Sequence, residues 1–217
     1  MVSETVAPGS SSSESRLLIQ FARTPQVGRV KTRMVPFLSE EDACELHCQL
    51  VLWTCSQLLH SKAAEVELSV AGAATHPLFD ECLALGVARI TPQQGDDLGQ
   101  RMYRALVAAL QQHESVLLVG SDCPGIDSVY IEAAFAALKE SDVVLGPATD
   151  GGYVLIGAKR INAGIFEDIN WGTEQVFEQT VESLRKTGLS WACLPTLSDI
   201  DRPEDLPVWE MFKHGSS

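Results

Sequence analysis

Short hydrophobic runs alternate with amphipathic stretches along the chain, and this pattern predicts strands and helices in turn. Five apolar runs are typical of strands: 17–22, 66–71, 88–91, 115–120 and 189–194. Helical spacing of apolar residues predicts helices over about 40–60, 77–85, 97–112, 127–139 and 174–187, and within 199–212. Strands that alternate with helices indicate an α/β fold, and we expect a three-layer α/β/α sandwich.

Two further β-rich runs, 142–148 and 152–158, are joined by Asp150 and Gly151, a pair typical of a hairpin with a type I′ turn. The hairpin adds an antiparallel strand, so we expect a mixed, mostly parallel sheet. In such sheets, ligands bind beyond the carboxyl ends of the strands. The residues that follow each strand are therefore the candidates for a functional site.

Polar residues before the helical stretches predict where the helices begin. The candidate N-caps are Ser39, Asp97, Asp127 and Thr173. Asp201 is a further candidate, because an early proline and an acid follow it at Pro203 and Glu204. Its simplest interpretation is therefore structural.

Composition and charge limit the class of protein. The chain has 217 residues, of which 45% are hydrophobic, and we expect one domain over 16–214. Residues 1–15 are Ser-rich and lack the features of a secretory signal, so we expect a disordered leader and a cytoplasmic protein. No apolar run approaches the roughly 20 residues that span a bilayer. The net charge of −13 argues against nucleic acid as a partner, but not against a small anion.

Three cysteines lie on one predicted helix and raise the question of a metal or redox site. Cys44, Cys48 and Cys55 share an apolar stripe with Val51 and Leu58. Buried thiols pack as small hydrophobic groups, and neither a CxxC pair nor a histidine pair accompanies them. We therefore interpret these cysteines as core residues.

The segment after the first strand gathers cations in an otherwise acidic protein. Arg23, Arg29, Lys31 and Arg33 lie within eleven positions, and Gly28 permits close approach of the backbone to a ligand. A diphosphate would suit such a loop. The loop matches neither the Walker A pattern nor the GxGxxG fingerprint. A solvated basic loop is the alternative, and the position after a strand favours phosphate binding.

Acidic residues follow two other strands. Asp122 ends the fourth run, and because Asp127 already serves the next helix, Asp122 is a candidate ligand for Mg²⁺ bound together with substrate phosphates. A turn aspartate is the alternative. Asp199 follows the last strand and has no capping duty, which makes it the second candidate for a metal-facing carboxylate.

Four other residues are candidates on less specific grounds. Gly152 would let a substrate approach and Tyr153 could stack on it or hydrogen-bond to it, although a simple turn explains the segment equally well. Arg101 lies in the first turns of a helix, where the helix dipole disfavours a cation, so it could meet an anion. Trp171 is either a core residue or a wall of the pocket.

Five strand-end motifs, taken together and in order, resemble a known family: FARTPQVGRVKTR, GSDCPGI, GPATDGGYVLIG, WGTEQV and DIDRPEDL. It is the glycosyltransferase-like family of bacterial proteins long grouped under a domain of unknown function, with some members linked to arsenosugar biosynthesis. The family is similar in fold to the GT-A glycosyltransferases and to the molybdenum-cofactor and phospholactate guanylyltransferases. The resemblance covers residues 17 to about 207 and implies a GT-A-like fold.

The resemblance also implies roles for the motifs. The first matches a phosphate loop, Asp122 matches an acidic motif that holds Mg²⁺ or Mn²⁺, and the hairpin is thought to face an acceptor. The matching positions are Arg23, Gly28, Arg29, Lys31 and Arg33, then Asp150, Gly151 and Gly152, and lastly Asp199 and Asp201 in a late acidic motif that often supplies a second metal ligand. The usual Asp-x-Asp of GT-A enzymes is reduced to one acid, which brings the site closer to the nucleotidyltransferases.

Together these features predict a metal-dependent transferase that uses a nucleotide-activated donor and a small-molecule acceptor. Glycosyl transfer from a nucleotide-diphospho-sugar is the first hypothesis. In it, Lys31 and the basic loop stabilise the leaving diphosphate, and Asp150 orients or deprotonates the acceptor hydroxyl. The alternatives are a nucleotidyltransferase that releases pyrophosphate and a non-catalytic nucleotide-sugar binding protein.

Overall fold

One mixed sheet is the frame of the molecule in the computed structural model, which describes residues 15–35 and 37–215. Its strands are β1 (Arg16–Arg23), β2 (Glu65–Ala71), β3 (Arg89–Pro92), β4 (Ser115–Val119), β5 (Val143–Pro147), β6 (Tyr153–Ala158) and β7 (Trp191–Cys193). The α-helices are α1 (Glu40–Ser61), α2 (Pro77–Leu85), α3 (Leu98–Leu110), α4 (Ser128–Glu140), α5 (Val176–Thr187) and α6 (Leu206–Gly215). Short 3₁₀ helices are η1 (Thr32–Met34), η2 (Ala163–Phe166) and η3 (Pro203–Asp205).

The strands lie in the order β3-β2-β1-β4-β6-β5-β7. β1 pairs in parallel with β2 and β4, and β3 adds in parallel to β2. β6 runs antiparallel to both β4 and β5, while β7 is parallel to β5. The predicted α/β fold with a mixed, mostly parallel sheet is confirmed.

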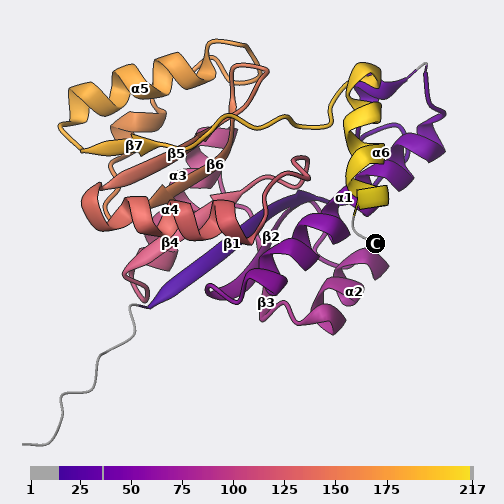
Figure 1. Ribbon diagram of the computed structural model, residues 1–217, viewed down its shortest axis with the longest axis horizontal. Coiled ribbons are helices and arrows are strands. Elements are labelled where there is room, and N and C mark those ends of the chain that lie inside the picture. The colour runs from indigo at the N-terminus through magenta and orange to yellow at the C-terminus, as the bar shows by residue number, and fades with distance from the viewer. Residues whose placement is uncertain (1–14, 36, 216–217) are drawn as a thin grey trace, which may run out of the picture.

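Helices cover both faces of the sheet and form three layers (Figure 1). On one face, Leu18 and Ala22 of β1 pack with buried residues of α1, α2 and α4. On the other, Leu17, Ile19 and Phe21 pack with α3, η2 and α5. This division follows from the pleat of β1, which sends successive side chains to opposite faces.

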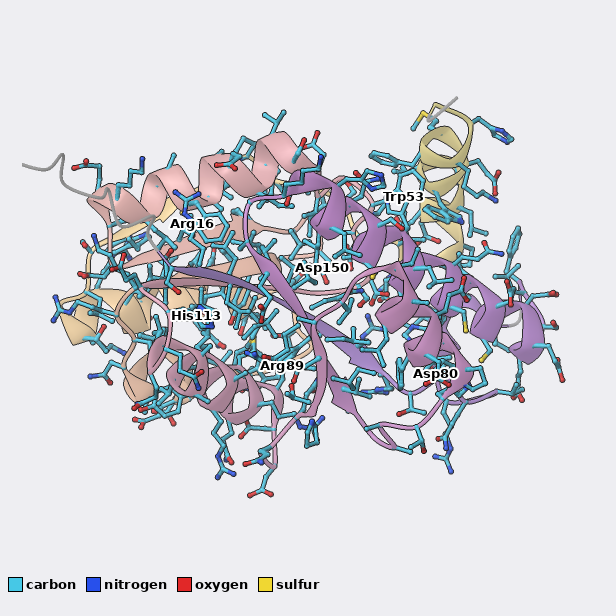
Figure 2. The ribbon with its side chains drawn as sticks, turned by 90° about the horizontal axis from the view of Figure 1, so that it is seen from below. Arg16, Trp53, Asp80, Arg89, His113 and Asp150 are labelled. Carbon is cyan, nitrogen blue, oxygen red and sulfur yellow. The ribbon has the colours of Figure 1, made fainter. Side chains whose placement is uncertain are left out.

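A smaller third core lies where η1, α1 and α6 meet. Met34 of η1 and Leu50 of α1 pack there with Ile200 and with Trp209 of α6. Trp53 meets Trp209 edge to face, with ring centroids 5.5 Å apart, and Figure 2 shows Trp53 beside α6. The core thus attaches α6 to α1.

Most predicted helix starts are confirmed, and two are wrong. Side chains of Ser39, Asp97 and Asp127 accept hydrogen bonds from the first turns of α1, α3 and α4. Thr173 does not cap α5, which begins at Val176: its oxygen accepts from the Gln175 N–H, before the helix, and its hydroxyl donates to the Asn170 carbonyl.

The start predicted at Asp201 is also different in the structure. The carboxylate of Asp205 accepts hydrogen bonds from the backbone N–H groups of Asp201 and Arg202, and η3 precedes α6. The N-cap is therefore Arg202, with Asp205 as the acid of the first turn, and the Asp201 side chain is left for another partner.

The hairpin between β5 and β6 forms as predicted, but its turn is not type I′. That turn needs a positive φ at both central residues, and Asp150 does not have one, whereas Gly151 does, at φ 87°. The Gly151 N–H instead donates to the Ala148 carbonyl, and the strand register shifts between Gly146 and Pro147.

The cysteine stripe and the helix lengths bear on two other expectations. Cys55 is fully buried in the core under α1 and Cys48 packs against that core, which confirms the interpretation for these two, whereas Cys44 is half-buried and lies outside the three cores. Over residues 15–35 and 37–215, no helix is both long and apolar enough to cross a membrane.

Candidate active site

The basic loop and Asp122 meet because β1 and β4 are parallel neighbours. Their register runs from Arg16 opposite Ser115 to Gln20 opposite Val119, so the segments that follow both strands leave the same edge of the sheet. There, Lys31 Nζ lies 2.8 Å from Asp122 Oδ1. The ammonium group also donates to the Ile200 carbonyl, so three distant segments meet at one side chain.

The two members of this ion pair differ in burial. The Lys31 side chain is 3% exposed, whereas that of Asp122 is 45% exposed. Asp122 Oδ1 is buried, so its second oxygen faces the opening. An ion pair with a buried partner is screened less by water and salt than one on the surface. Salt should therefore weaken this pair less than it weakens a surface pair.

Lys31 reaches this position through an unusual backbone conformation. Its φ of 49° and ψ of 35° are left-handed, a region that is unfavourable for residues other than glycine by roughly 1–2 kcal/mol. The Met34 N–H donates to the Lys31 carbonyl and closes η1, while the Met34 side chain is fully buried. Packing of η1 thus offsets the local cost and aims the ammonium inward.

A buried polar network holds the end of β4, and sequence reasoning missed most of it. Ser121 Oγ donates to the Phe21 carbonyl over 2.7 Å, and Gln20 Nε2 donates to Ser121 Oγ over 2.9 Å. Thr54 of α1 donates to the Ser121 carbonyl. The one available signal was Gln20, a polar residue inside an otherwise apolar strand.

Four aspartates gather around the late acidic motif. Burial, and then the charges of Asp150, Asp201 and Asp122, raise the pKa of Asp199 to about 6. Arg33 pairs with Asp201, and the hydrogen bond and charge of Asp201 raise the pKa of the Arg33 guanidinium. Acidic charge is therefore only partly balanced by the cations here.

A cavity of about 510 Å³ opens over the ion pair. Seven predicted site residues line it: Arg23, Arg29, Lys31, Arg33, Arg101, Asp122 and Asp201. His47 of α1 lines it as well, which sequence reasoning missed. Its Nε2 donates to the Arg23 carbonyl over 2.9 Å, and burial lowers the pKa of the imidazole. A neutral His47 thus holds the backbone at the start of the basic loop.

Gly28 lies in an adjoining hollow that shares Arg23, Arg29 and Arg101 with the main cavity. It has a φ of 72°, which glycine adopts without strain. A Cβ at this position would also lie 2.8 Å from the Glu40 carboxylate. Local conformation and close packing both explain the glycine.

The predicted hairpin residues Asp150, Gly151 and Gly152 do not line the cavity over the ion pair, and neither does Asp199. The charge of Asp150 acts on Asp199 and Arg33, and its Oδ1 accepts the Gly152 N–H over 2.8 Å. A Cβ on Gly151 would overlap the Glu174 carbonyl, so packing against the segment before α5 requires this glycine.

Tyr153 and Trp171 do not line the cavity over the ion pair. Their rings meet edge to face with centroids 6.5 Å apart, against the core under α3 and α5. The Tyr153 hydroxyl is buried, and burial raises the pKa of the phenol. Trp171 instead lines a separate hollow with Asp97, Tyr103 and Phe166.

The donor set limits how a metal could bind. Among residues 15–35 and 37–215, no three His, Cys, Asp or Glu side chains form a group that could hold an ion. Mg²⁺ often takes only one or two carboxylates and completes its coordination with substrate phosphates and water. The free oxygen of Asp122 and the crowded carboxylate of Asp199 fit that mode of binding.

Comparison with known proteins places the chain in a family. Residues 54–173, more than half of the chain, match the family described as "Uncharacterized protein conserved in bacteria (DUF2064)". The chain belongs to the DUF2064 family. A solved structure from Desulfovibrio desulfuricans G20, described as a "putative nucleotide-diphospho-sugar transferase", is 32% identical, with a TM-score of 0.83 over 94% of this chain and 90% of that one. No match was found among curated proteins.

More distant structures share the fold of this DUF2064 protein. A 4-diphosphocytidyl-2C-methyl-D-erythritol synthase from Anaerococcus prevotii is 10% identical, with a TM-score of 0.62 over 93% of this chain and 99% of that one. The inositol-1-phosphate CTP transferase from T. maritima is 16% identical, with a TM-score of 0.56 over 93% and 96%. At these identities the likeness concerns the fold alone.

Proposed function

We propose that this protein is a transferase that binds the diphosphate of a nucleotide-activated donor over the Lys31–Asp122 pair. The glycosyl group of a nucleotide-diphospho-sugar is the group transferred. The observation that carries the proposal is a buried ammonium at the base of a cavity lined by four arginines, in an acidic protein. The description of the D. desulfuricans relative supports the same substrate class.

Lys31 can bind a phosphate without leaving its present partners. An ammonium has three N–H donors. The Ile200 carbonyl accepts one of them and Asp122 lies 2.8 Å away as the counter-ion, so N–H donors remain for a phosphate oxygen. The arginines around the cavity would add bidentate hydrogen bonds to the same diphosphate. These donors stabilise the negative charge that develops as the diphosphate leaves.

We propose Asp150 as the residue that orients and deprotonates the acceptor hydroxyl. One of its oxygens is held by Gly152, and the other can accept the proton of an acceptor hydroxyl. The acceptor oxygen then forms the new glycosidic bond as the bond from the sugar carbon to the phosphate oxygen breaks. The nucleoside diphosphate is the leaving group. Mg²⁺ or Mn²⁺ held by Asp122 and Asp199 would supply further neutralisation of the diphosphate charge.

Donor binding by calorimetry tests the proposal, with UDP-sugars and GDP-sugars in the presence of Mg²⁺ or Mn²⁺. We expect the substitution Arg29→Gln to weaken binding about tenfold, the effect of one lost charge-assisted hydrogen bond. Lys31→Gln should weaken it further. Arg185→Gln, on α5 and outside the cavity, is the matched control. Equal affinity in all four proteins would contradict the proposal.

A nucleotidyltransferase is the second candidate. The single acid at Asp122, paired with a lysine rather than with another acid, favours it. In that reaction a nucleoside triphosphate would donate its nucleotidyl group and release pyrophosphate. Pyrophosphate formed from a triphosphate, with no turnover of sugar nucleotides, would decide for this alternative. Binding without any turnover would instead identify a nucleotide-sugar binding protein.

A further inference from the structure

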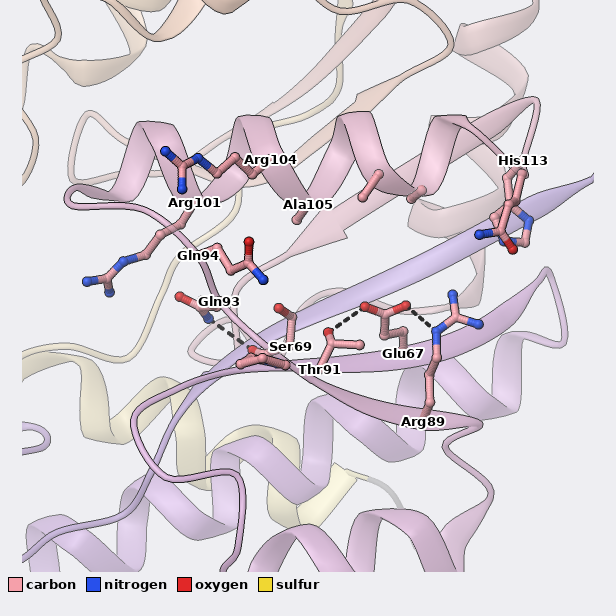
Figure 3. Close-up of a pocket in the computed structure, with 14 residues that line it drawn as sticks. Glu67, Ser69, Arg89, Thr91, Gln93, Gln94, Arg101, Arg104, Ala105 and His113 are labelled. Carbon is pink, nitrogen blue, oxygen red and sulfur yellow. Dashed lines mark hydrogen bonds and ion pairs between the residues drawn. The ribbon is translucent and has the colours of Figure 1, made fainter.

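A polar hollow of about 470 Å³ lies between α3 and the strands β2 and β3 (Figure 3). The register pairs Glu67 and Ser69 of β2 with Ile19 and Phe21 of β1, so these four side chains share one face of the sheet. In β1 this face is apolar and packs under α3. In β2 the same face is polar, at positions where a core residue would be expected.

These polar residues are buried rather than solvated. Glu67 is 8% exposed, and its carboxylate accepts hydrogen bonds from Arg89 Nε and Thr91 Oγ1, each over 2.6 Å. Ser69 is 2% exposed, and its hydroxyl makes no hydrogen bond to any residue that the structure describes. The Ser69 hydroxyl lines the hollow and is open to a hydrogen bond with a ligand there.

Protection of the sheet edge explains only part of the pattern. β3 is the edge strand, and charged residues and prolines on edge strands prevent pairing with other chains. That accounts for Arg89 and Pro92. It does not account for Glu67 and Ser69, because β2 is paired on both sides.

The wall opposite the strands is cationic. Arg101 and Arg104 lie one turn apart on α3, and Figure 3 shows them at one end of the hollow with His113 at the other. Arg104 is exposed and has no ion pair or hydrogen bond within the described part of the chain. Arg89 is paired with Glu65 and Glu67, so Arg101 and Arg104 are the lining arginines that remain for a ligand, in a protein whose net charge is −13.

We infer that this hollow binds a small phosphorylated polyol. Glu67, Ser69 and Thr91 offer hydrogen-bond partners for hydroxyl groups at its floor, and Arg101 and Arg104 offer donors for a phosphate at its rim. Gln93 and Arg101 line both this hollow and the cavity over Lys31, so the two sites adjoin. The inference does not rest on the proposed transferase activity.

Calorimetry with sn-glycerol 3-phosphate tests the inference on the full chain, with glycerol and inorganic phosphate as partial ligands. We expect binding to the unaltered protein that Arg104→Gln weakens about tenfold and Ser69→Ala weakens severalfold. Glycerol should not bind measurably, and phosphate should bind more weakly than the complete probe. Arg104 is exposed and Ser69→Ala removes only a hydroxyl, so both variants should fold, as circular dichroism will show.

Two controls locate the binding. Arg185→Gln removes an arginine outside the hollow and should leave the affinity unchanged. Arg29→Gln alters the neighbouring cavity and should also leave it unchanged. The inference is wrong if glycerol 3-phosphate fails to bind at millimolar concentration, or if Arg104→Gln and Ser69→Ala bind it as tightly as the unaltered protein. Loss of binding in Arg29→Gln alone would place the probe in the other cavity and would equally overturn the inference.

Discussion

Lys31 combines an unfavourable backbone conformation with a position in the candidate site. Its left-handed backbone turns the chain so that the ammonium points back between β1 and β4. An arginine would carry the same charge but on a planar group that spreads it over several nitrogens, whereas the Lys31 side chain is 3% exposed and brings its charge to one atom. The compact charge of a lysine suits this buried position.

The pH dependence of folding stability can also be predicted from single residues. Burial and the neighbouring acids raise the pKa of Asp199 to about 6, above its ordinary value of 3.8. The folded state therefore holds this proton more tightly than the unfolded state, and folding stability falls as the pH rises through that interval. We expect Asp199→Asn to raise the melting temperature at about pH 7.5, and to raise it much less at about pH 4.5.

Asp142 is a control of opposite sign for this prediction. Hydrogen bonds from Ser190 lower the pKa of Asp142, so its ionised form stabilises the fold above its ordinary pKa. Asp142→Asn should therefore lower the melting temperature at about pH 7.5. Thermal unfolding of both variants in matched buffers measures the two effects, and a lower melting temperature for Asp199→Asn at neutral pH would contradict the assignment.

At the scale of elements, the β5–β6 hairpin depends on one close contact. Gly151 has a φ of 87°, and a Cβ there would overlap the backbone of Glu174. Gly188, at the end of α5, also has a positive φ of 70° but has no atom within 4 Å of a Cβ. Comparing Gly151 with Gly188 therefore separates the cost of the left-handed backbone from the cost of steric overlap.

We expect Gly188→Ala to lower the free energy of unfolding by about 1 kcal/mol, the strain of a left-handed alanine. Gly151→Ala adds the overlap and should cost at least twice as much. Denaturant unfolding followed by fluorescence measures both values. If the two variants lose equal stability, then the segment before α5 moves freely and the hairpin is not held against it.

Elements were the part of the structure that sequence patterns predicted best. The alternation of apolar runs located every strand to within a few residues, and Ser39, Asp97 and Asp127 marked helix starts because a cap acts on its own first turn. Thr173 failed because its oxygen accepts from the Gln175 N–H, in a turn that precedes α5. Where that turn ends depends on the loop's conformation, which the sequence pattern does not specify.

Sequence patterns predicted many residues of the candidate site but not which of them are in contact. The rule that ligands bind beyond strand ends selected Lys31 and Asp122, and the structure brings both to one cavity. That they touch depends on β4 lying beside β1, an order that periodicity does not reveal. Tyr153 and Trp171 lie elsewhere because the hairpin's pleat turns the tyrosine toward α5 and away from the basic loop.

At the scale of the whole molecule, the site is assembled from segments far apart in the sequence. The basic loop, the start of α1 and the late acidic motif have no strand in common. They are joined instead by the third core, in which Met34, Leu50 and Ile200 pack with Trp209. Ile200 also accepts from Lys31 and donates its N–H to the Asp122 carbonyl. This small core should therefore control the geometry of the site.

Two leucines of α1 allow that control to be measured. Leu50 and Leu58 are both fully buried, but Leu50 belongs to the third core and Leu58 to the core under the sheet. Substituting either by alanine should cost about 2–5 kcal/mol of stability. Only Leu50→Ala should also weaken binding of the sugar nucleotide, because the cavity it leaves lets Ile200 shift and withdraws a partner from Lys31. Affinity measured well below both melting temperatures separates the two effects, and equal weakening in both variants would mean that global stability, not the third core, sets the geometry of the site.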